Sequence, residues 1–389
     1  MQSTRAGADT GFALTGVIVL ALVLKYPFFE YGPRYAAATG ESLVEGYARI
    51  GRWALWLYLA ITLSTAFIVQ GAVVLFTAFL VQAAFALPLG LPVVSAIVMA
   101  VCAGLLRLGR YRGLDVTTKV ILTLLTISTL WAAGLVASRA DWSTLAPWPP
   151  ASSAVSLGFV LALVGWMPSA IDISVWSSVW TLAKNRDAGR AVSVKHAVLD
   201  FRVGYIATGV LAFAFLLLGA GVMYGSGTSF SNAGTQFSVQ LVDLYGAALG
   251  SWTQPIVLVA VLTTMGSTAL TVIDGFPRAI ARTVVVLRGE SPASSDSDVG
   301  TAYWLSGAML AALTLLVVTY AGTRLTVMVD FATTVSFLTG PILGYLNFRV
   351  IRGANVSPAD RPGRVLVAIS RAGLVLLGGT AFVYLISWL

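Results

Sequence analysis

The sequence predicts an all-α integral membrane protein, and three observations lead to this fold class. Of the 389 residues, 58% are hydrophobic and only 10% are charged, whereas soluble domains carry about 25% charged residues. The apolar residues gather in runs of about 20, the length at which a helix crosses the hydrocarbon core of a bilayer. The basic residues gather in the short segments between these runs. A water-soluble enzyme is therefore excluded, because the charged residues are too few to cover its surface.

Ten apolar runs are long enough to span a membrane, whereas residues 1–10 are small and polar and span nothing. The runs cover 11–38, 53–80, 91–107, 114–137, 154–182, 199–224, 252–286, 302–320, 324–350 and 365–388. No polar interval between them could hold a core of its own, so the whole chain, 1–389, is predicted to be one transmembrane domain. The expected partner is a lipid bilayer, and the expected location is a cell membrane, that of a bacterium, crossed many times.

The basic residues predict how the chain is oriented. One set of alternating loops is rich in arginine and lysine, for example at Arg107, Arg190 and Arg352, whereas the opposite set holds few, for example Arg139. Cytoplasmic loops carry the excess of basic residues. The basic set is therefore predicted to face the cytoplasm, and both ends of the chain are predicted to face outside.

The interval 225–251 is predicted to be an outer loop containing an amphipathic surface helix. Its apolar residues recur at helical spacing, at Phe237, Leu241, Leu244, Tyr245 and Ala248. Such a stripe on one face is typical of a helix that lies in the plane of the membrane interface.

Composition excludes several kinds of site. Cys102 is the only cysteine and His196 the only histidine, which argues against a disulfide framework and against a zinc or haem site. The net charge of +8 does not indicate a nucleic-acid partner, because the basic residues belong to loops between spans. No paired carboxylates, nucleophile–base set or phosphate loop can be found, so we expect neither an enzyme nor a resident cofactor.

The fifth run contains the most informative motif. Gly165 and Pro168 lie close to its middle, and proline removes a helical hydrogen bond and clashes with the preceding turn. We expect the helix to break here into two halves. Broken helices at the membrane midplane supply free carbonyls and helix ends to the substrate sites of many transporters. The alternative is a simple kink that binds no ligand.

Several charged residues fall inside spans, where they need a partner or a role. Asp172 follows the predicted break by one turn, with Trp176 and Trp180 on the same helical face. It is either part of a functional site or a carboxylate satisfied by hydroxyls or a buried cation. Asp274 precedes Arg278 by four residues, which predicts a structural ion pair. Lys25, with Glu30, is predicted to snorkel or pair at the inner interface.

Two motifs resemble those of the NRAMP family of proton-coupled divalent metal transporters. They are residues 25–42, KYPFFEYGPRYAAATGES, and residues 165–172, GWMPSAID. The order and spacing of the spans resemble the family over essentially the whole chain. The resemblance implies a LeuT-like inverted-repeat bundle with about ten full transmembrane helices plus a partial first helix. It also implies a metal held between the unwound centres of the first and sixth helices.

Carried over by position, Met167 and Pro168 match the Met-Pro of the family's sixth helix, and the carbonyl of Val164 matches a carbonyl ligand. Ser169 stands where the family has histidine. The carboxylates of the family's third helix have no counterpart, since no Asp or Glu occurs between Glu45 and Asp115.

The start of the chain departs most from the family. Residues 2–9 resemble the outer half of the first helix, so its inner half and unwound centre are expected to precede Met1. Either the chain is truncated or its start is wrongly assigned. Gln2 and Arg5 would then lie at the outer edge of the site, where Arg5 would repel a divalent cation and attract an anion.

The sequence therefore predicts an NRAMP-like secondary transporter that moves a divalent metal ion. Its predicted substrate-binding residues are Val164, Gly165, Met167, Ser169, Asp172, Gln2 and Arg5, with Met167 and Asp172 as metal ligands. A thioether would favour a softer ion over calcium or magnesium, and Asp172 would have to supply the negative charge. The alternatives are a carrier of a non-metal solute on the same fold and a truncated membrane protein that transports nothing.

Overall fold

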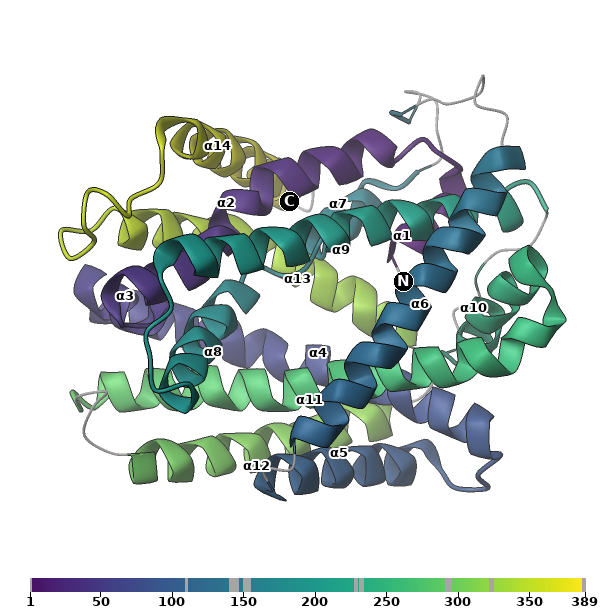
Figure 1. The fold of residues 1–389 in the computed structure, drawn as a ribbon, viewed down its shortest axis with the longest axis horizontal. Coiled ribbons are helices and arrows are strands. Elements are labelled where there is room, and N and C mark those ends of the chain that lie inside the picture. The colour runs from purple at the N-terminus through teal and green to yellow at the C-terminus, as the bar shows by residue number, and fades with distance from the viewer. Residues whose placement is uncertain are drawn as a thin grey trace.

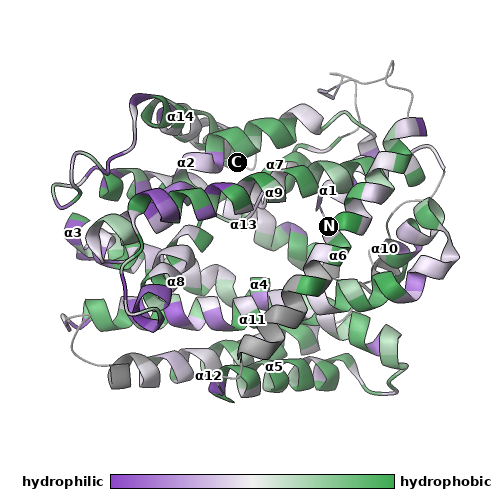
Figure 2. Ribbon diagram, viewed as in Figure 1, coloured by the Kyte–Doolittle hydropathy of each residue, from purple (hydrophilic) through white to green (hydrophobic). Residues whose placement is uncertain are grey.

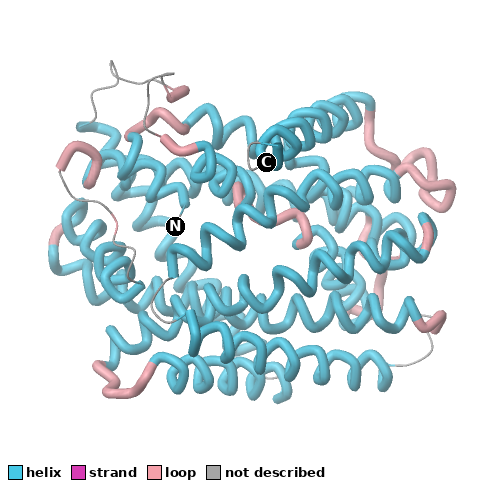
Figure 3. The backbone as a smooth tube through the Cα atoms, turned by 180° about the vertical axis from the view of Figure 1, so that it is seen from behind, coloured by secondary structure: helices cyan, strands magenta, loops and turns pink. Residues whose placement is uncertain are grey.

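Helices are the only regular secondary structure in the described part of the chain (Figure 3). In the computed structural model, the described residues are 2–108, 111–139, 147–149, 155–226, 230, 234–290, 296–321 and 325–386. The all-α class predicted from the composition is confirmed.

The first seven helices in the chain are α1 (Gln2–Thr10), α2 (Thr15–Thr39), α3 (Leu43–Ile50), α4 (Arg52–Phe85), α5 (Leu91–Leu108), α6 (Tyr111–Arg139) and α7 (Leu157–Gly165). The remaining elements are α8 (Ile173–Asp187), α9 (Val194–Val222), α10 (Gly234–Leu249), the 3₁₀ turn η2 (Ser251–Thr253), α11 (Gln254–Leu287), α12 (Asp296–Ala321), α13 (Leu325–Ile351) and α14 (Arg364–Ile386).

Eight helices of the described chain are long and apolar enough to cross a membrane. They coincide with eight of the ten predicted spans, and most of their residues are hydrophobic (Figure 2). Of the other two predicted spans, 114–137 forms α6, a helix of 29 residues. The span 154–182 is interrupted as expected, because α7 ends at Gly165 and α8 begins at Ile173. The predicted break around Pro168 is confirmed.

The helices form a bundle in which most of the long helices run near the long axis of the molecule, whereas α6 crosses that axis steeply (Figure 1). Helices α11 and α12 lie side by side along one edge, and α2 and α14 lie together along the opposite edge. Between them, α13 contacts α2, α4 and α7. Of the broken pair, α7 packs against α13 and α2, and α8 packs against α2, α11 and α3.

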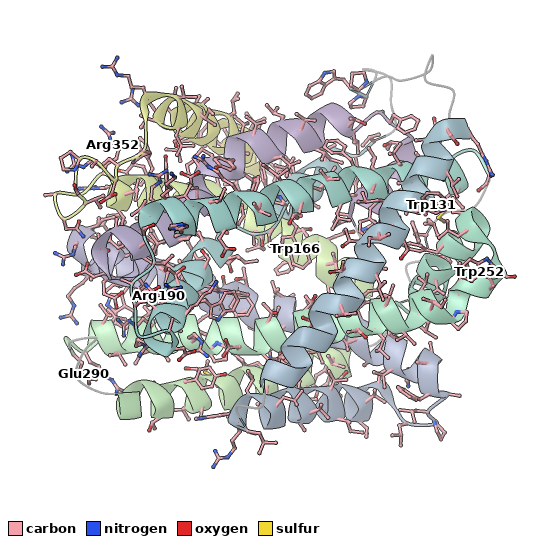
Figure 4. The ribbon with its side chains drawn as sticks, viewed as in Figure 1. Trp131, Trp166, Arg190, Trp252, Glu290 and Arg352 are labelled. Carbon is pink, nitrogen blue, oxygen red and sulfur yellow. The ribbon has the colours of Figure 1, made fainter. Side chains whose placement is uncertain are left out.

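The two ends of the bundle differ in their side chains. Arg190, Glu290 and Arg352 lie at one end, whereas Trp131 and Trp252 lie at the other (Figure 4). Both tryptophans are largely exposed, as expected of aromatic residues at a membrane interface. Arg190 and Arg352 belong to the basic set predicted to face the cytoplasm, so this end is called the inner end and the tryptophan end the outer end.

Close packing at two glycines holds α1 against α9. A Cβ atom added at Gly7 would lie 2.1 Å from the carbonyl oxygen of Leu216, and one added at Gly219 would lie 2.1 Å from that of Thr4. Small residues let the backbones of membrane helices approach this closely. The short polar helix α1 is thereby fixed at the start of the chain, with Thr4 and Ala6 fully buried.

Helix α10 lies within the interval 225–251, where a surface helix was predicted. Of the predicted apolar stripe, Leu244 and Tyr245 are buried, and Tyr245 forms a 2.8 Å hydrogen bond with the hydroxyl of Thr129. The side chains of Phe237 and Leu241 lie outside the described residues. The described part of the stripe therefore packs against α6 and other helices of the bundle.

Candidate functional site

Helical hydrogen bonding is interrupted between α7 and α8, and a lysine from α2 binds three backbone carbonyls at this break. One of them, the carbonyl of Val164, also accepts a 3.3 Å hydrogen bond from the backbone N–H of Met167. The ammonium nitrogen of Lys25 lies 3.0 Å from the carbonyl oxygen of Val164, 2.9 Å from that of Gly165 and 2.6 Å from that of Ser169. Lys25 is only 3% exposed. In this structure the ammonium of Lys25 therefore occupies the break.

This position of Lys25 differs from the expected one at the inner interface. The residue lies ten positions after Thr15 and fourteen before Thr39, the ends of α2, so its side chain is too far from either end to snorkel. It points instead into the bundle, because α2 packs against both α7 and α8. The pairing predicted for Glu30 is present, through Arg34 at 2.6 Å and Arg202 at 3.4 Å.

Asp172 lies at the other side of the break, immediately before α8. It is 7% exposed, and its Oδ1 atom is buried without a hydrogen-bond partner. Lys25 and Asp172 are not within ion-pair distance, since none of the ion pairs between described residues joins them. A buried carboxylate oxygen with unused hydrogen-bonding capacity is a ready ligand for a cation.

Met167 is buried in a different environment. It is 4% exposed and belongs to an apolar cluster that includes Leu14, Ile18, Leu163 and Leu216. Its neighbour Trp166, at the centre of the molecule (Figure 4), donates a 3.1 Å hydrogen bond to the hydroxyl of Ser336 on α13. The two residues hold the break in place, and a role for Met167 as a metal ligand stays a prediction.

Gln2 and Arg5 lie apart from the break carbonyls. The guanidinium of Arg5 lies 2.8 Å from the carboxylate of Asp330 and 5.2 Å from the centre of the Phe159 ring. Gln2 donates a 3.3 Å hydrogen bond to the same carboxylate. Arg5, Phe159 and Asp330 line a cavity of about 870 Å³ that also includes Tyr224 and Tyr384, which we call the outer cavity. The predicted site residues are thus divided between two places.

A second cavity, of about 1020 Å³, approaches the break from the other end. Its lining runs from Lys184 and Arg190, near the inner end, to Pro168 and Ser169 in the break itself. Phe29 of α2 forms part of the wall. This inner cavity therefore reaches from the inner end to Ser169, one of the three residues whose carbonyls hold Lys25.

Acidic, histidine and cysteine side chains do not gather into a metal site: no group of three or more could hold a metal ion among the residues described. A cation at the break would depend on the three carbonyls and on Asp172 as its one negative charge.

Two polar networks brace the site. The predicted pair of Asp274 and Arg278 is confirmed at 2.7 Å, and Trp180 and Tyr303 each donate a 2.9 Å hydrogen bond to the same carboxylate.

The second network was not predicted. The amide nitrogen of Asn347 donates to the carbonyl of Phe28 at 3.0 Å and to the hydroxyl of Ser174 at 2.7 Å, which joins α13 to α2 and α8. A buried asparagine within an apolar span was the signal that could have revealed it.

A helical membrane bundle with a central helix broken at mid-depth, between one cavity from each end, defines a secondary transporter of LeuT-like fold. The family model described as "Nramp: Natural resistance-associated macrophage protein-like" matches residues 2–385. The chain belongs to this family, and it is a multi-pass membrane protein.

Known proteins resemble the chain in sequence and in structure. A protein of Pasteurella multocida (strain Pm70), described as "Uncharacterized protein PM0681", is 34% identical over 359 residues, which cover 90% of this chain and 80% of that protein. The crystal structure of the Eremococcus coleocola manganese transporter in complex with an aromatic bis-isothiourea substituted compound superposes with a TM-score of 0.72. That match has 14% identity and covers 98% of this chain and 81% of the transporter. A mutant form of the same transporter matches with a TM-score of 0.72 at 15% identity.

Proposed function

We propose that this chain is a secondary transporter that moves a divalent metal ion across the membrane, and that the ion binds at the α7–α8 break. Membership of the Nramp family supports metal as the substrate, and the structural match to a manganese transporter supports the fold. The observation that carries the proposal is the set of three break carbonyls that already holds an ammonium group, together with the unpartnered carboxylate oxygen of Asp172, three residues after Ser169 in the chain.

The ligands have distinct roles in this proposal. The carbonyls of Val164, Gly165 and Ser169 replace part of the hydration shell of the ion. Asp172 supplies negative charge, which carbonyls cannot, and a divalent ion needs it because removing its hydration shell is costly. The inner cavity, which reaches Ser169, is the route between the site and the cytoplasm.

Uptake of manganese and cadmium into proteoliposomes tests this proposal. We expect the unmodified protein to take up both ions and the Asp172→Asn variant to lose most of this uptake, because the amide keeps the shape but removes the charge. Asp243→Asn is a matched control, since Asp243 is exposed on α10 and bonds to Gln254. Absence of uptake by the unmodified protein would refute the metal substrate, and full uptake by Asp172→Asn would remove Asp172 from the site.

A further inference from the structure

Lys25 fills the break site completely. An ammonium group has three N–H donors and no acceptor, and the structure gives it three carbonyl acceptors, from Val164, Gly165 and Ser169. These hydrogen bonds connect residues 139 to 144 positions apart in the chain. All donors of the ammonium are therefore used, and none is left for another acceptor.

Lys25 in turn provides hydrogen-bond donors for the backbone carbonyls at the break. Backbone carbonyls freed at membrane depth are costly unless they are buried against a partner or line a cavity filled with water. Without substrate, the three carbonyls would face each other in a buried site, and their partial negative charges would repel. The ammonium of Lys25 offsets this repulsion.

The same three oxygens cannot bind the ammonium and a metal ion together. We propose that Lys25 is a tethered substitute for the substrate: its ammonium occupies the cation site of the unloaded transporter and leaves when the metal ion binds. This inference rests on the metal-transport function proposed above and gives Lys25 the role of a competitor. It is a positioning residue for the unloaded state, not a ligand of the metal.

The structure provides a place for the displaced side chain. The ammonium of Lys25 lies 5.8 Å from the centre of the Phe29 ring, and Phe29 lines the inner cavity together with Ser169 and Tyr205. A cation is attracted to the face of an aromatic ring. The flexible lysine side chain can thus exchange the carbonyls for the ring and the water of the cavity by rotation about its own bonds.

Metal affinity of Lys25 variants, measured by calorimetry with manganese on the purified full chain, tests the inference. We expect Lys25→Gln and Lys25→Met to bind manganese at least about tenfold more tightly, because the competing charge is removed. Lys25→Arg, which keeps the charge, should gain no affinity. Lys195→Gln is the control, since Lys195 is exposed and does not line the inner cavity. Unchanged or weaker binding by both neutral variants would overturn the inference.

The calorimetry distinguishes failure of the proposed role of Lys25 from failure of the proposed metal substrate. If the unmodified protein binds manganese, Asp172→Asn weakens binding and the neutral Lys25 variants bind no better, the transport site stands and the role of Lys25 is wrong. If none of these proteins binds manganese, the metal substrate itself is wrong.

A measurement on the unmodified protein covers the case in which the neutral variants do not fold. Lys25 can be modified with a small amine-reactive reagent and the extent followed by mass spectrometry, with and without saturating manganese. We expect manganese to speed the modification of Lys25 severalfold while that of Lys195, which is exposed outside the cavity, stays constant, because displacement brings the amine of Lys25 into the inner cavity. Equal or slower modification of Lys25 would overturn the inference.

Discussion

The guanidinium of Arg5 and the carboxylate of Asp330 form a 2.8 Å ion pair that joins α1 to α13 in the wall of the outer cavity. The side chain of Arg5 is 14% exposed and that of Asp330 is 42% exposed. The positive charge expected to repel a cation from the entrance is thus balanced by a partner 325 residues away in the chain.

Removal of this positive charge should favour entry of cations. In Arg5→Gln, the carboxylate of Asp330 is left without its counter-ion in the cavity wall. Electrostatic attraction by charges that line a cleft alters the association rates of ions by about tenfold or more at low salt. We expect faster initial uptake of manganese than in the unmodified protein, with the difference shrinking as salt is added. Asp330→Asn should have the opposite effect. Equal rates for all three proteins at low salt would contradict this prediction.

The close approach of α7 and α13 depends on Gly165. A Cβ atom at this position would lie 2.0 Å from the carbonyl oxygen of Thr333, so an alanine forces the two helices apart. We expect Gly165→Ala to lower the free energy of unfolding by about 1–3 kcal/mol or more, seen as a lower thermal midpoint in detergent. Gly104→Ala is the control, because no atom lies within 4 Å of a Cβ there. A thermal midpoint for Gly165→Ala as high as that of the control would show that the helices adapt.

The carboxylate of Asp274 accepts hydrogen bonds from Arg278, Trp180 and Tyr303. In Asp274→Asn, the ion pair is lost and the amide nitrogen faces donors, so we expect the free energy of unfolding to fall by about 1–3 kcal/mol. Tyr303→Phe removes one of these hydrogen bonds and should cost only about 1 kcal/mol. Chemical denaturation in detergent measures both. If the two variants lose equal stability, the charge of Asp274 contributes nothing beyond one hydrogen bond.

Stability should depend on pH through Glu41 and Arg49, which lie outside the spans. The guanidinium of Arg49 donates hydrogen bonds of 2.9 and 2.5 Å to the Glu41 carboxylate and lowers the pKa of Glu41 below its ordinary value of 4.5. Because the folded-state pKa is the lower one, this contribution is present above pH 4.5 and is lost as the pH falls through the folded-state value.

We therefore expect Glu41→Gln to lower the thermal midpoint at pH 7 but to match the unmodified protein in acid. The effect should be below about 1 kcal/mol, since the Arg49 side chain is 53% exposed and water screens such pairs. A difference between the two proteins that stays constant from pH 7 to acid would contradict this assignment.

The sequence alone determined the class of protein, the spans and the break. Hydrophobic runs of membrane length can satisfy their backbone groups only as helices, so eight spans and α6 lie where the runs predicted. Pro168 cannot continue a helix, so the division into α7 and α8 followed from local chemistry. Asp274 and Arg278 are one helical turn apart, so their pairing was also local.

Only the tertiary structure decided which side chains meet across helices. Lys25 binds carbonyls some 140 residues away, Asp330 neutralises Arg5, and Asn347 joins α13 to α2 and α8. The charged residues of α2, Lys25, Glu30 and Arg34, indicate a side that faces protein, but they do not indicate which helix lies opposite. The contacts of α2 with α7 and α8 decided that Lys25 meets the carbonyls of the break.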